Sequence, residues 1–284
     1  MIKKINYFFQ AIIIYFLFLV GRIIGLNLSR KFFSFIFNLL GSKFRSNKIL
    51  EENLKIFSKE ISNKEINIIK EKMWKNYGKT FIEYIFLDFF NKNNSHVEIS
   101  GEEKLKNKLK AEKSVIFISG HFANFELMSM EITKMQIKLA TIYRPLNNFF
   151  LNPLMEFLRK KYVCKNQIEK GIKGVRDTIE YIKRKHCIAL MIDQRVSEGE
   201  KINLFGKPAF TTTLPAQLAI KFNLSIIPVY IERKEDNNFK IEFLDEIKPE
   251  GLNKYKLTNE LNHILEKMIK RNPNQWIWTH NRWK

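Results

Sequence analysis

The sequence has few cysteines and lacks several motifs that mark common enzyme classes. Only two cysteines occur among its 284 residues, Cys164 and Cys187, with no CxxC pair and no histidine-rich spacing. This argues against a disulfide framework and against a zinc site, so we predict no metal, and it is consistent with a reducing cytosol. The motifs GxSxG, GxxxxGK[ST], GxGxxG and HExxH are absent. Serine-hydrolase, phosphate-loop, dinucleotide-binding and zinc-protease chemistry therefore have no support.

Acidic residues are scarce relative to basic ones. The chain has 49 Lys and Arg against 29 Asp and Glu, which gives a net charge of +20. This excess predicts an anionic partner, either nucleic acid or an acidic membrane surface, although frequent Lys, Ile and Asn throughout make part of it a compositional habit. No nucleic-acid-binding module is recognisable, and the apolar N-terminus argues against one. We therefore expect a membrane partner and no nucleic acid.

Residues 1–45 are predicted to be a membrane anchor with a basic flank. The run from Ile5 to Val20 contains Gln10 as its one strongly polar side chain, and extension to Leu26 reaches spanning length if Arg22 snorkels to the interface. A signal peptide and a buried or interfacial helix are the alternatives, but no small-x-small cleavage site follows. Five basic residues between positions 30 and 48 outnumber the two leading lysines, which places the main body in the cytoplasm.

Residues 46–94 are predicted to form a helical, aromatic-rich segment that packs on the following domain. Ser62-Asn-Lys-Glu65 resembles a capping box, and apolar residues follow at near-helical spacing. The aromatic residues of the stretch 81–90 are expected to lie mostly in the core. A groove for an acyl chain is the alternative interpretation.

Residues 95–284 are predicted to form one α/β domain, because short apolar runs alternate with helical patterns. A largely parallel central sheet flanked by helices is the expected architecture. The expected strands are Val115–Ser119, Leu139–Tyr143, Cys187–Ile192, Ser225–Ile231 and Phe239–Phe243. The expected helices are Asn124–Met135, Asn152–Tyr162, Ile172–Lys185, Leu214–Asn223 and Leu257–Arg271.

The stretch from Ser114 to Met130 carries the strongest chemical signal. An apolar strand breaks at Gly120, presents His121 and resumes as a helix with Asn124 as a plausible N-cap. On one ideal helix His121 and Glu126 would lie about 140° apart, so they do not share a helical face. They meet if His121 lies in the turn and Glu126 in the first helical turn. Glu126 would then hold the tautomer of a histidine base that activates a hydroxyl group.

Three predicted strands end at an ionisable residue. They lead to His121, Arg144 and Asp193. Because sites in open α/β sheets gather at the carboxyl ends of parallel strands, a base, a cation and an anion would share one crevice if these strands are neighbours. Each residue alone has an ordinary structural explanation, and the shared placement is what favours function.

Four ordered blocks of the sequence resemble one protein family over nearly the whole chain. Gly120-His121 with Asn124 and Glu126 resembles the HxxxxE/D signature of the lysophospholipid acyltransferase superfamily. The later blocks resemble the bacterial lipid A biosynthesis (late, lauroyl/myristoyl) acyltransferases. These blocks are Tyr143-Arg-Pro145 with Asn152-Pro-Leu154; Asp193-Gln194, Phe205-Gly-Lys-Pro-Ala209, Thr211 and Pro215-Ala-Gln-Leu-Ala219; and Arg271-Asn-Pro-Asn-Gln-Trp276, Trp278, His280 and Arg282-Trp283.

The resemblance implies a glycerolipid acyltransferase-like fold and transfer of a fatty acyl chain from acyl carrier protein to a 3-hydroxyacyl hydroxyl of a phosphorylated lipid A precursor. This would take place at the cytoplasmic face of the bacterial inner membrane, with the protein single-pass or monotopic. No cofactor is implied, because the thioester donor is already activated. His121 would be the general base and Glu126 would orient it.

The resemblance also implies supporting roles for other residues. Arg144 would bind the oxyanion or a phosphate, Asp193 would buttress the site, and Arg159 is the nearest match to a further arginine of the family. Trp276 and Trp278 are expected to be structural, with a place at the lipid headgroups as the alternative. Two other functions are weighed: an acyltransferase of the same fold that uses acyl-CoA or another glycolipid or lysophospholipid acceptor, and a non-catalytic membrane-associated binding protein.

Overall fold

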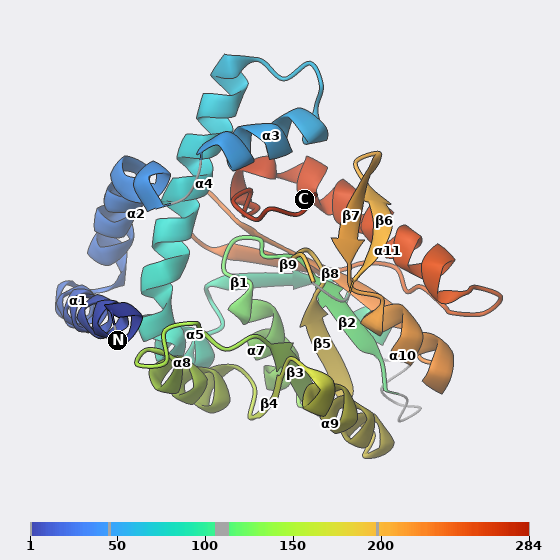
Figure 1. Ribbon diagram of the computed structural model, residues 1–284. Helices are drawn as coiled ribbons and strands as arrows, with labels where there is room; N and C mark the ends of the chain where they lie inside the picture. The colour runs from blue at the N-terminus through green and yellow to red at the C-terminus, as the bar shows by residue number, and fades with distance from the viewer. Residues whose placement is uncertain (1, 45–46, 106–113, 197–198, 284) are drawn as a thin grey trace.

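The computed structural model describes residues 2–44, 47–105, 114–196 and 199–283 (Figure 1). In these ranges the centre of the molecule is a seven-stranded sheet with the order β1-β9-β8-β2-β5-β3-β4. Neighbouring strands run parallel except β8 and β9, which are antiparallel, so the expected largely parallel sheet is confirmed. The strands are β1 (Val97–Ser100), β2 (Ile116–Ser119), β3 (Leu139–Tyr143), β4 (Asn166–Glu169), β5 (Cys187–Met191), β8 (Ile226–Arg233) and β9 (Phe239–Phe243).

Helices connect the strands and cover the sheet (Figure 1). Helix α9 shows why: its buried residues Gly174, Thr178 and Ile182 recur every four positions and form one inward stripe. The expected helices are present with shifts of a few residues at their ends. The one expected from Asn152 to Tyr162 changes at Arg159 into a π-helical turn, η2 (Arg159–Val163). The helices are α7 (Glu126–Lys134), α8 (Asn152–Leu158), α9 (Ile172–Lys183), α10 (Leu214–Phe222) and α11 (Lys254–Arg271), with the short η3 (Pro273–Gln275) after them.

A separate antiparallel hairpin, β6 (Glu200–Leu204) and β7 (Lys207–Thr211), projects beside the sheet. Its two-residue turn consists of Phe205 and Gly206, both with positive φ, 52° and 71°. Two positive φ angles match the twist of paired strands in a two-residue turn. The sequence pattern does not predict this hairpin.

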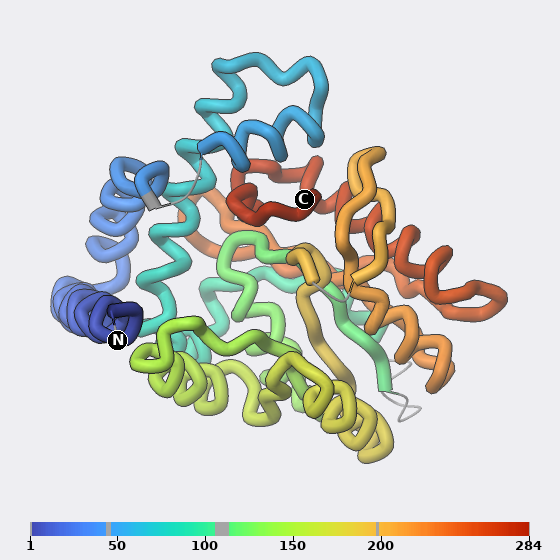
Figure 2. The backbone as a smooth tube through the Cα atoms, viewed as in Figure 1, coloured from blue at the N-terminus to red at the C-terminus, as the bar shows by residue number. Residues whose placement is uncertain are grey.

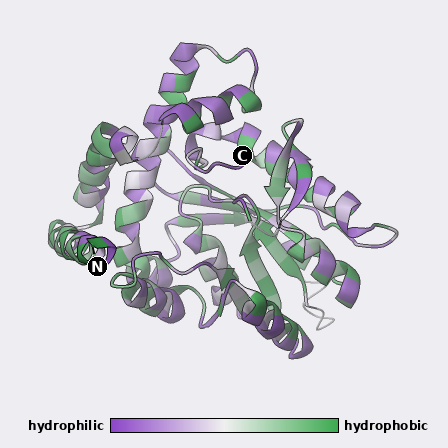
Figure 3. Cartoon of the chain, viewed as in Figure 1, coloured by the Kyte–Doolittle hydropathy of each residue, from purple (hydrophilic) through white to green (hydrophobic). Residues whose placement is uncertain are grey.

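Residues 2–44 contain two helices, one over the expected apolar segment and one over the expected basic flank. Helix α1 (Ile2–Ile24) and helix α2 (Leu26–Phe44) are separated at Gly25, whose φ of +80° is costly for residues with a Cβ. Helix α1 is long and apolar enough to cross a membrane, and Figure 3 shows its mostly hydrophobic composition. Figure 2 shows α1 beside the segment that precedes α8, where Tyr15 donates to the carbonyl of Phe150 at 2.8 Å and Asn148 to that of Tyr7 at 2.8 Å.

The next segment is helical, with α3 (Asn47–Phe57), α4 (Asn63–Glu83), η1 (Tyr84–Phe86) and α5 (Leu87–Lys92). The capping box between Ser62 and Glu65 is confirmed. Tyr84, Phe86 and Phe90 are buried, so most of the aromatic stretch belongs to the core, as expected.

A buried ionic cluster fixes helix α4 to its neighbours. Glu83 is fully buried and binds Arg30 of α2 and Arg233 of β8. Burial opposes the charged carboxylate, but the two guanidinium groups hold the pKa of Glu83 below its ordinary value. The same carboxylate accepts a hydrogen bond from Asn124 at 3.0 Å. The N-terminal helices and the turn that carries His121 are therefore joined through one side chain.

Candidate active site

The register of the central strands brings His121 and Asp193 together. Strands β2 and β5 pair in parallel with Ser119 opposite Met191. His121 follows Ser119 by two positions and Asp193 follows Met191 by two, so both side chains leave the sheet at the same carboxyl edge. Arg144 follows β3, which lies on the other side of β5. The three strands are neighbours, as convergence of their ends requires.

Asp193 holds the imidazole of His121 in place. Its Oδ1 lies 2.7 Å from His121 Nδ1, and its Oδ2 accepts the backbone N–H of His121 at 2.7 Å and the Nε1–H of Trp276 at 2.8 Å. Burial alone would raise the pKa of Asp193, but electrostatic attraction to His121, the hydrogen bonds from His121 and the nearby His280 hold that pKa well below its ordinary value. An ionised Asp193 accepts a hydrogen bond from Nδ1–H of His121, which leaves the lone pair of His121 Nε2 available as a base.

Gln194 and the C-terminal segment, residues 273–283, complete the surroundings of His121. Gln194 Nε2 lies 3.1 Å from His121 Nε2 and 3.2 Å from His280 Nε2. The segment is tied by backbone hydrogen bonds to the turn that carries His121, because Ala123 N–H donates to Gln275 O at 3.2 Å and Phe122 forms an antiparallel bridge with Trp276. Trp276 and Trp278 are 2% and 0% exposed, which confirms their structural placement.

Glu126 occupies the first turn of α7, as expected, but its hydrogen bonds go elsewhere. Its Oε1 accepts from Arg159 Nη2 at 2.6 Å, from Arg159 Nε at 2.8 Å and from the Tyr84 hydroxyl at 2.5 Å. The expected contact of Glu126 with His121 is therefore corrected, since the carboxylate bonded to the His121 ring is that of Asp193. The reason is topological. Strand β5, which leads to Asp193, lies directly beside β2, which leads to His121. Glu126 instead forms an ion pair with Arg159 at the start of η2.

Glu126, Arg159 and Tyr84 form an ionic cluster. The side chains of Arg159 and Glu126 are 12% and 8% exposed. Burial disfavours the charged guanidinium, but the charges and hydrogen bonds of Glu126 and Tyr84 hold the pKa of Arg159 above its ordinary value. Burial, reinforced by the Glu126 charge, raises the pKa of Tyr84 well above its ordinary value. Tyr84 therefore acts as a neutral donor and Arg159 as a permanent cation.

Asn124 is not the N-cap that the sequence analysis expected. The cap of α7 is Phe125, without a side-chain hydrogen bond, because Ala123 has a φ of 44° and turns the chain before the helix begins. The Asn124 side chain is fully buried and donates to Glu83. Thr80 of α4 donates to the carbonyl of Ala123 at 2.9 Å. Asn124 therefore fastens the turn that presents His121.

One cavity of about 710 Å³ opens at these strand ends. Its lining includes the polar side chains of His121, Gln194 and His280, together with Gln10, Ile14 and Phe18 of α1. Arg144, which is exposed, lines it as well. Five further lining residues are buried: Met128, Ser129, Thr141, Val163 and Ala189. The cavity is thus lined by His121 and by residues of the N-terminal helix α1, and much of its lining is apolar.

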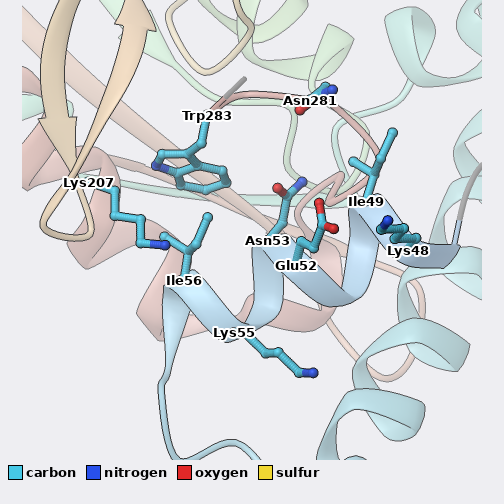
Figure 4. A pocket seen from close by; sticks show the side chains of 9 residues that line it. All are labelled: Lys48, Ile49, Glu52, Asn53, Lys55, Ile56, Lys207, Asn281 and Trp283. Atoms are coloured by element: carbon cyan, nitrogen blue, oxygen red, sulfur yellow. The ribbon is translucent and has the colours of Figure 1, made fainter.

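A second cavity, also of about 710 Å³, lies between α3, the hairpin and the C-terminal segment (Figure 4). Its lining includes Lys48, Lys55, Lys207, Asn281 and Trp283. Its three lysines outnumber its one carboxylate, Glu52, so it is basic overall, and the part of the lining that the structure describes contains no histidine and no cysteine. This cavity is suited to an anionic partner rather than to acyl-transfer chemistry.

The sequence predicts no role in the site for Tyr84 or Gln194, and it predicts a structural place for Trp276 without its contact to Asp193. Gln194 had a signal, because it directly follows Asp193 at the end of a strand. Tyr84 and Trp276 belong to aromatic segments with ordinary core spacing, so no local signal separates them from packing residues. Within the described ranges, no group of three or more His, Cys, Asp or Glu side chains is arranged to hold a metal ion.

Comparison with known proteins identifies relatives of the whole chain. The sequence profile of the family described as bacterial lipid A biosynthesis acyltransferase matches residues 2–284. The lipid A biosynthesis palmitoleoyltransferase of Escherichia coli (strain K12) and the lipid A biosynthesis acyltransferase of Shigella flexneri are each 24% identical over 250 residues, which covers 84% of this chain and 79% of theirs. Among solved structures, a 1-acyl-sn-glycerophosphate acyltransferase from Thermotoga maritima aligns over 89% of this chain and 100% of its own, with 12% identity and a TM-score of 0.42.

Proposed function

Since this chain belongs to the bacterial lipid A biosynthesis acyltransferase family, we propose that it moves a fatty acyl chain from acyl carrier protein to a 3-hydroxyacyl hydroxyl of a lipid A precursor. It is an acyltransferase by family; the donor, the acceptor hydroxyl and the residue roles are the proposal. One observation carries it. The His121–Asp193 pair faces a cavity of about 710 Å³ that the apolar helix α1 helps to line.

In the proposed reaction His121 is the general base. Its Nε2 takes the proton of the acceptor hydroxyl as the oxygen attacks the thioester carbonyl, and Asp193 stabilises the imidazolium ion. When the tetrahedral intermediate collapses, the C–S bond breaks and the departing thiolate takes the proton back from His121. General-base assistance of this kind contributes about 10²–10⁴ in rate. The thioester supplies the activated carbonyl, so the step uses no cofactor.

Glu126 and Arg159 hold the scaffold of the site in this proposal. Their ion pair ties the first turn of α7 to η2 and so fixes the loop before α7. Arg144 lies at the exposed rim of the cavity, at the end of β3, where a cation suits a phosphate of the acceptor better than it suits the buried reacting carbonyl.

The charge distribution supports an acidic carrier protein as donor. The net charge is +20, and Lys48, Lys55 and Lys207 line the second cavity (Figure 4). The other wall of that cavity is the C-terminal segment, which carries His280 at the catalytic cavity and Asn281 at the basic one. An acidic carrier protein bound at the basic cavity would contact the C-terminal segment, whose His280 lines the same cavity as His121. Acyl-CoA as donor, or another glycolipid or lysophospholipid as acceptor, is the alternative.

The test is an assay of the purified full chain with both donors and several acceptors. Acyl-carrier thioester and acyl-CoA are each offered with a phosphorylated glycolipid that has a free 3-hydroxyacyl hydroxyl, and with a lysophospholipid, and product mass is measured. Acylated glycolipid from the carrier thioester is expected, with His121→Ala inactive but folded. Transfer to lysophospholipid alone would replace the proposed acceptor, and full activity of His121→Ala would overturn the mechanism.

We also propose that α1 lies in the membrane interface rather than across the bilayer. Its inner side contacts the domain from Tyr7 to Arg22, where Arg22 pairs with Asp88 at 2.7 Å. Its outer side exposes large apolar side chains, among them Phe9, Phe16 and Leu19, at 58–63%. A helix that crossed the bilayer would have to leave these contacts. An in-plane helix keeps them and buries the outer side chains in lipid.

Labelling of single introduced cysteines separates the two arrangements. Lys3→Cys is placed at the start of α1 and Lys59→Cys, as control, after α3; both positions are exposed. With a membrane-impermeant maleimide, an interfacial α1 predicts that both react in inverted vesicles and neither in right-side-out ones. Reaction of Lys3→Cys in right-side-out vesicles would establish a spanning helix.

A further inference from the structure

The amide of Gln194 lies between two histidine rings. Its Nε2 is 3.1 Å from Nε2 of His121 and 3.2 Å from Nε2 of His280, and the ring centroids are 6.4 Å apart. A primary amide nitrogen carries two N–H bonds, so it can donate to both rings at once. In the free enzyme Gln194 is therefore hydrogen-bonded to Nε2 of His121, the nitrogen that accepts the proton in the proposed reaction.

The chemistry of His121 fixes which end of the Gln194 amide faces it. Asp193 accepts from Nδ1 of His121, so Nε2 carries a lone pair. A carbonyl oxygen 3.1 Å from that lone pair would be repelled, whereas an N–H is attracted. The orientation with the amide nitrogen toward His121 follows from Asp193, and His280 then accepts the second N–H.

The backbone holds Gln194 and His280 against each other. Arg282 is fully buried and donates from Nη1 to the carbonyl of Gln194 at 2.8 Å. Asn53 of α3 donates to the carbonyl of His280 at 2.8 Å. These bonds involve the main chain of both residues. Changes to the two side chains therefore leave the anchors of the C-terminal segment intact.

We infer that Gln194 is a further catalytic residue, the side-chain donor to the oxyanion, and that His280 is the positioning residue that aims it. The inference rests on the proposed acyl transfer. The acceptor hydroxyl must take the place of Gln194 at His121 Nε2 before its proton can be removed. The displaced amide stays beside the forming bond, where the carbonyl oxygen of the thioester needs a donor.

Each step balances with the groups already named. The acceptor oxygen forms a bond to the carbonyl carbon, its proton goes to His121 Nε2, and the π-electron pair moves onto the carbonyl oxygen, which accepts an N–H of Gln194. Collapse restores the C=O bond and breaks the C–S bond. The thiolate then receives the proton from His121, and Gln194 returns to its resting contact.

Steady-state kinetics of the full chain in detergent micelles test the role of Gln194. Gln194→Met keeps the length and removes the donor, so kcat should fall about 10²–10³-fold, as for the loss of one oxyanion donor. The KM for the acceptor should not rise, because the hydroxyl no longer has to displace an amide. Gln194→Glu, which keeps the shape, should show the same loss or a larger one. Gln217→Met on α10, where the glutamine is exposed, is the matched control and should leave kcat unchanged.

Variants of His280 test the positioning role. His280→Ala should lower kcat about tenfold, and His280→Gln should recover most of it, because its carbonyl oxygen accepts the same N–H of Gln194. The double variant Gln194→Met/His280→Ala should be no slower than Gln194→Met alone, since His280 acts through Gln194. Independent multiplication of the two losses would overturn the positioning role.

The outcome also separates this inference from the proposed function. An inactive wild-type chain, or an active His121→Ala variant, would reject the proposed reaction itself. An inactive His121→Ala together with wild-type kcat in both Gln194 variants would reject the oxyanion donor and leave the reaction standing. If the thermal unfolding midpoints of the Gln194 and His280 variants equal that of the Gln217→Met control, a folding defect is excluded as the cause of their lower kcat.

Discussion

Two buried carboxylates, Asp193 and Glu126, lie near the turn that carries His121, and they differ in what they bind. Asp193, 2% exposed, accepts from His121 and Trp276. Glu126, 7% exposed, accepts from Arg159 and Tyr84. Each therefore has one aromatic donor and one basic partner. The difference is that an imidazole gains and loses a proton near neutral pH, whereas a guanidinium group stays protonated. Asp193 is suited to proton transfer and Glu126 to structural support.

Among the variants that test this comparison, Asp193→Asn should have the largest effect on kcat. An asparagine keeps the shape but donates where the aspartate accepts, so it favours the wrong tautomer of His121. Such a change lowers kcat by up to about 10⁴-fold in a comparable histidine–carboxylate pair. We expect at least a 10²-fold loss of kcat in acyl transfer with little change in KM. A loss equal to that of Glu126→Gln would remove the distinction between the two carboxylates.

Glu126→Gln should act mainly on stability. It leaves the Arg159 guanidinium, 12% exposed, without its anionic partner, and the loss of one partner of a buried pair costs about 3–5 kcal/mol. Denaturant unfolding in detergent measures this, and kcat of the remaining folded enzyme should fall less than in Asp193→Asn. The double variant Glu126→Gln/Arg159→Met removes the stranded charge and should regain part of the stability. No recovery would argue against an ion pair as the source of the loss.

The sequence predicts much of the sheet because its central strands are apolar. β3 and β9 have the expected bounds, and β2, β5 and β8 differ by one or two residues at an end. β4 was missed because Ile168 is its one buried residue, so the pattern lacks a hydrophobic run. The hairpin of β6 and β7 was missed because Phe205 adopts a positive φ that its residue type does not signal.

The chemical residues were easier to name than to pair. His121, Asp193, Arg144 and Glu126 all line the catalytic cavity or touch a residue that lines it. Their partners depend on strand order and register, which local spacing does not contain. A separation of five residues suggested Glu126 for His121, while the 72 residues to Asp193 are bridged by the pairing of β2 with β5.

The ionisation of Asp193 can be measured through stability. Because the folded state holds the pKa of Asp193 below its ordinary value, the stabilisation is complete above the unfolded pKa of about 3.9 and is lost as the pH falls through the folded value. The difference in unfolding free energy between wild type and Asp193→Asn should be smaller at pH 3 than at pH 5 by on the order of 1 kcal/mol. A difference that grows on acidification would contradict an ionised Asp193.

The smallest effects come from the aromatic donors, which form a matched pair. Tyr84→Phe removes the hydroxyl that donates to Glu126, and Trp276→Phe removes the N–H that donates to Asp193. A hydrogen bond to a charged group contributes about 1.5–3 kcal/mol, so both variants should lose stability of that order, with a further loss in Trp276→Phe from its smaller ring.

The two variants should differ in kcat. Trp276→Phe should slow transfer about tenfold, because about 1.4 kcal/mol of support for the His121–Asp193 pair corresponds to that factor. Tyr84→Phe should leave kcat within about threefold of wild type, because Arg159 still holds Glu126 through two nitrogens. Equal slowing in both variants would mean that Glu126 takes part in catalysis as directly as Asp193 does.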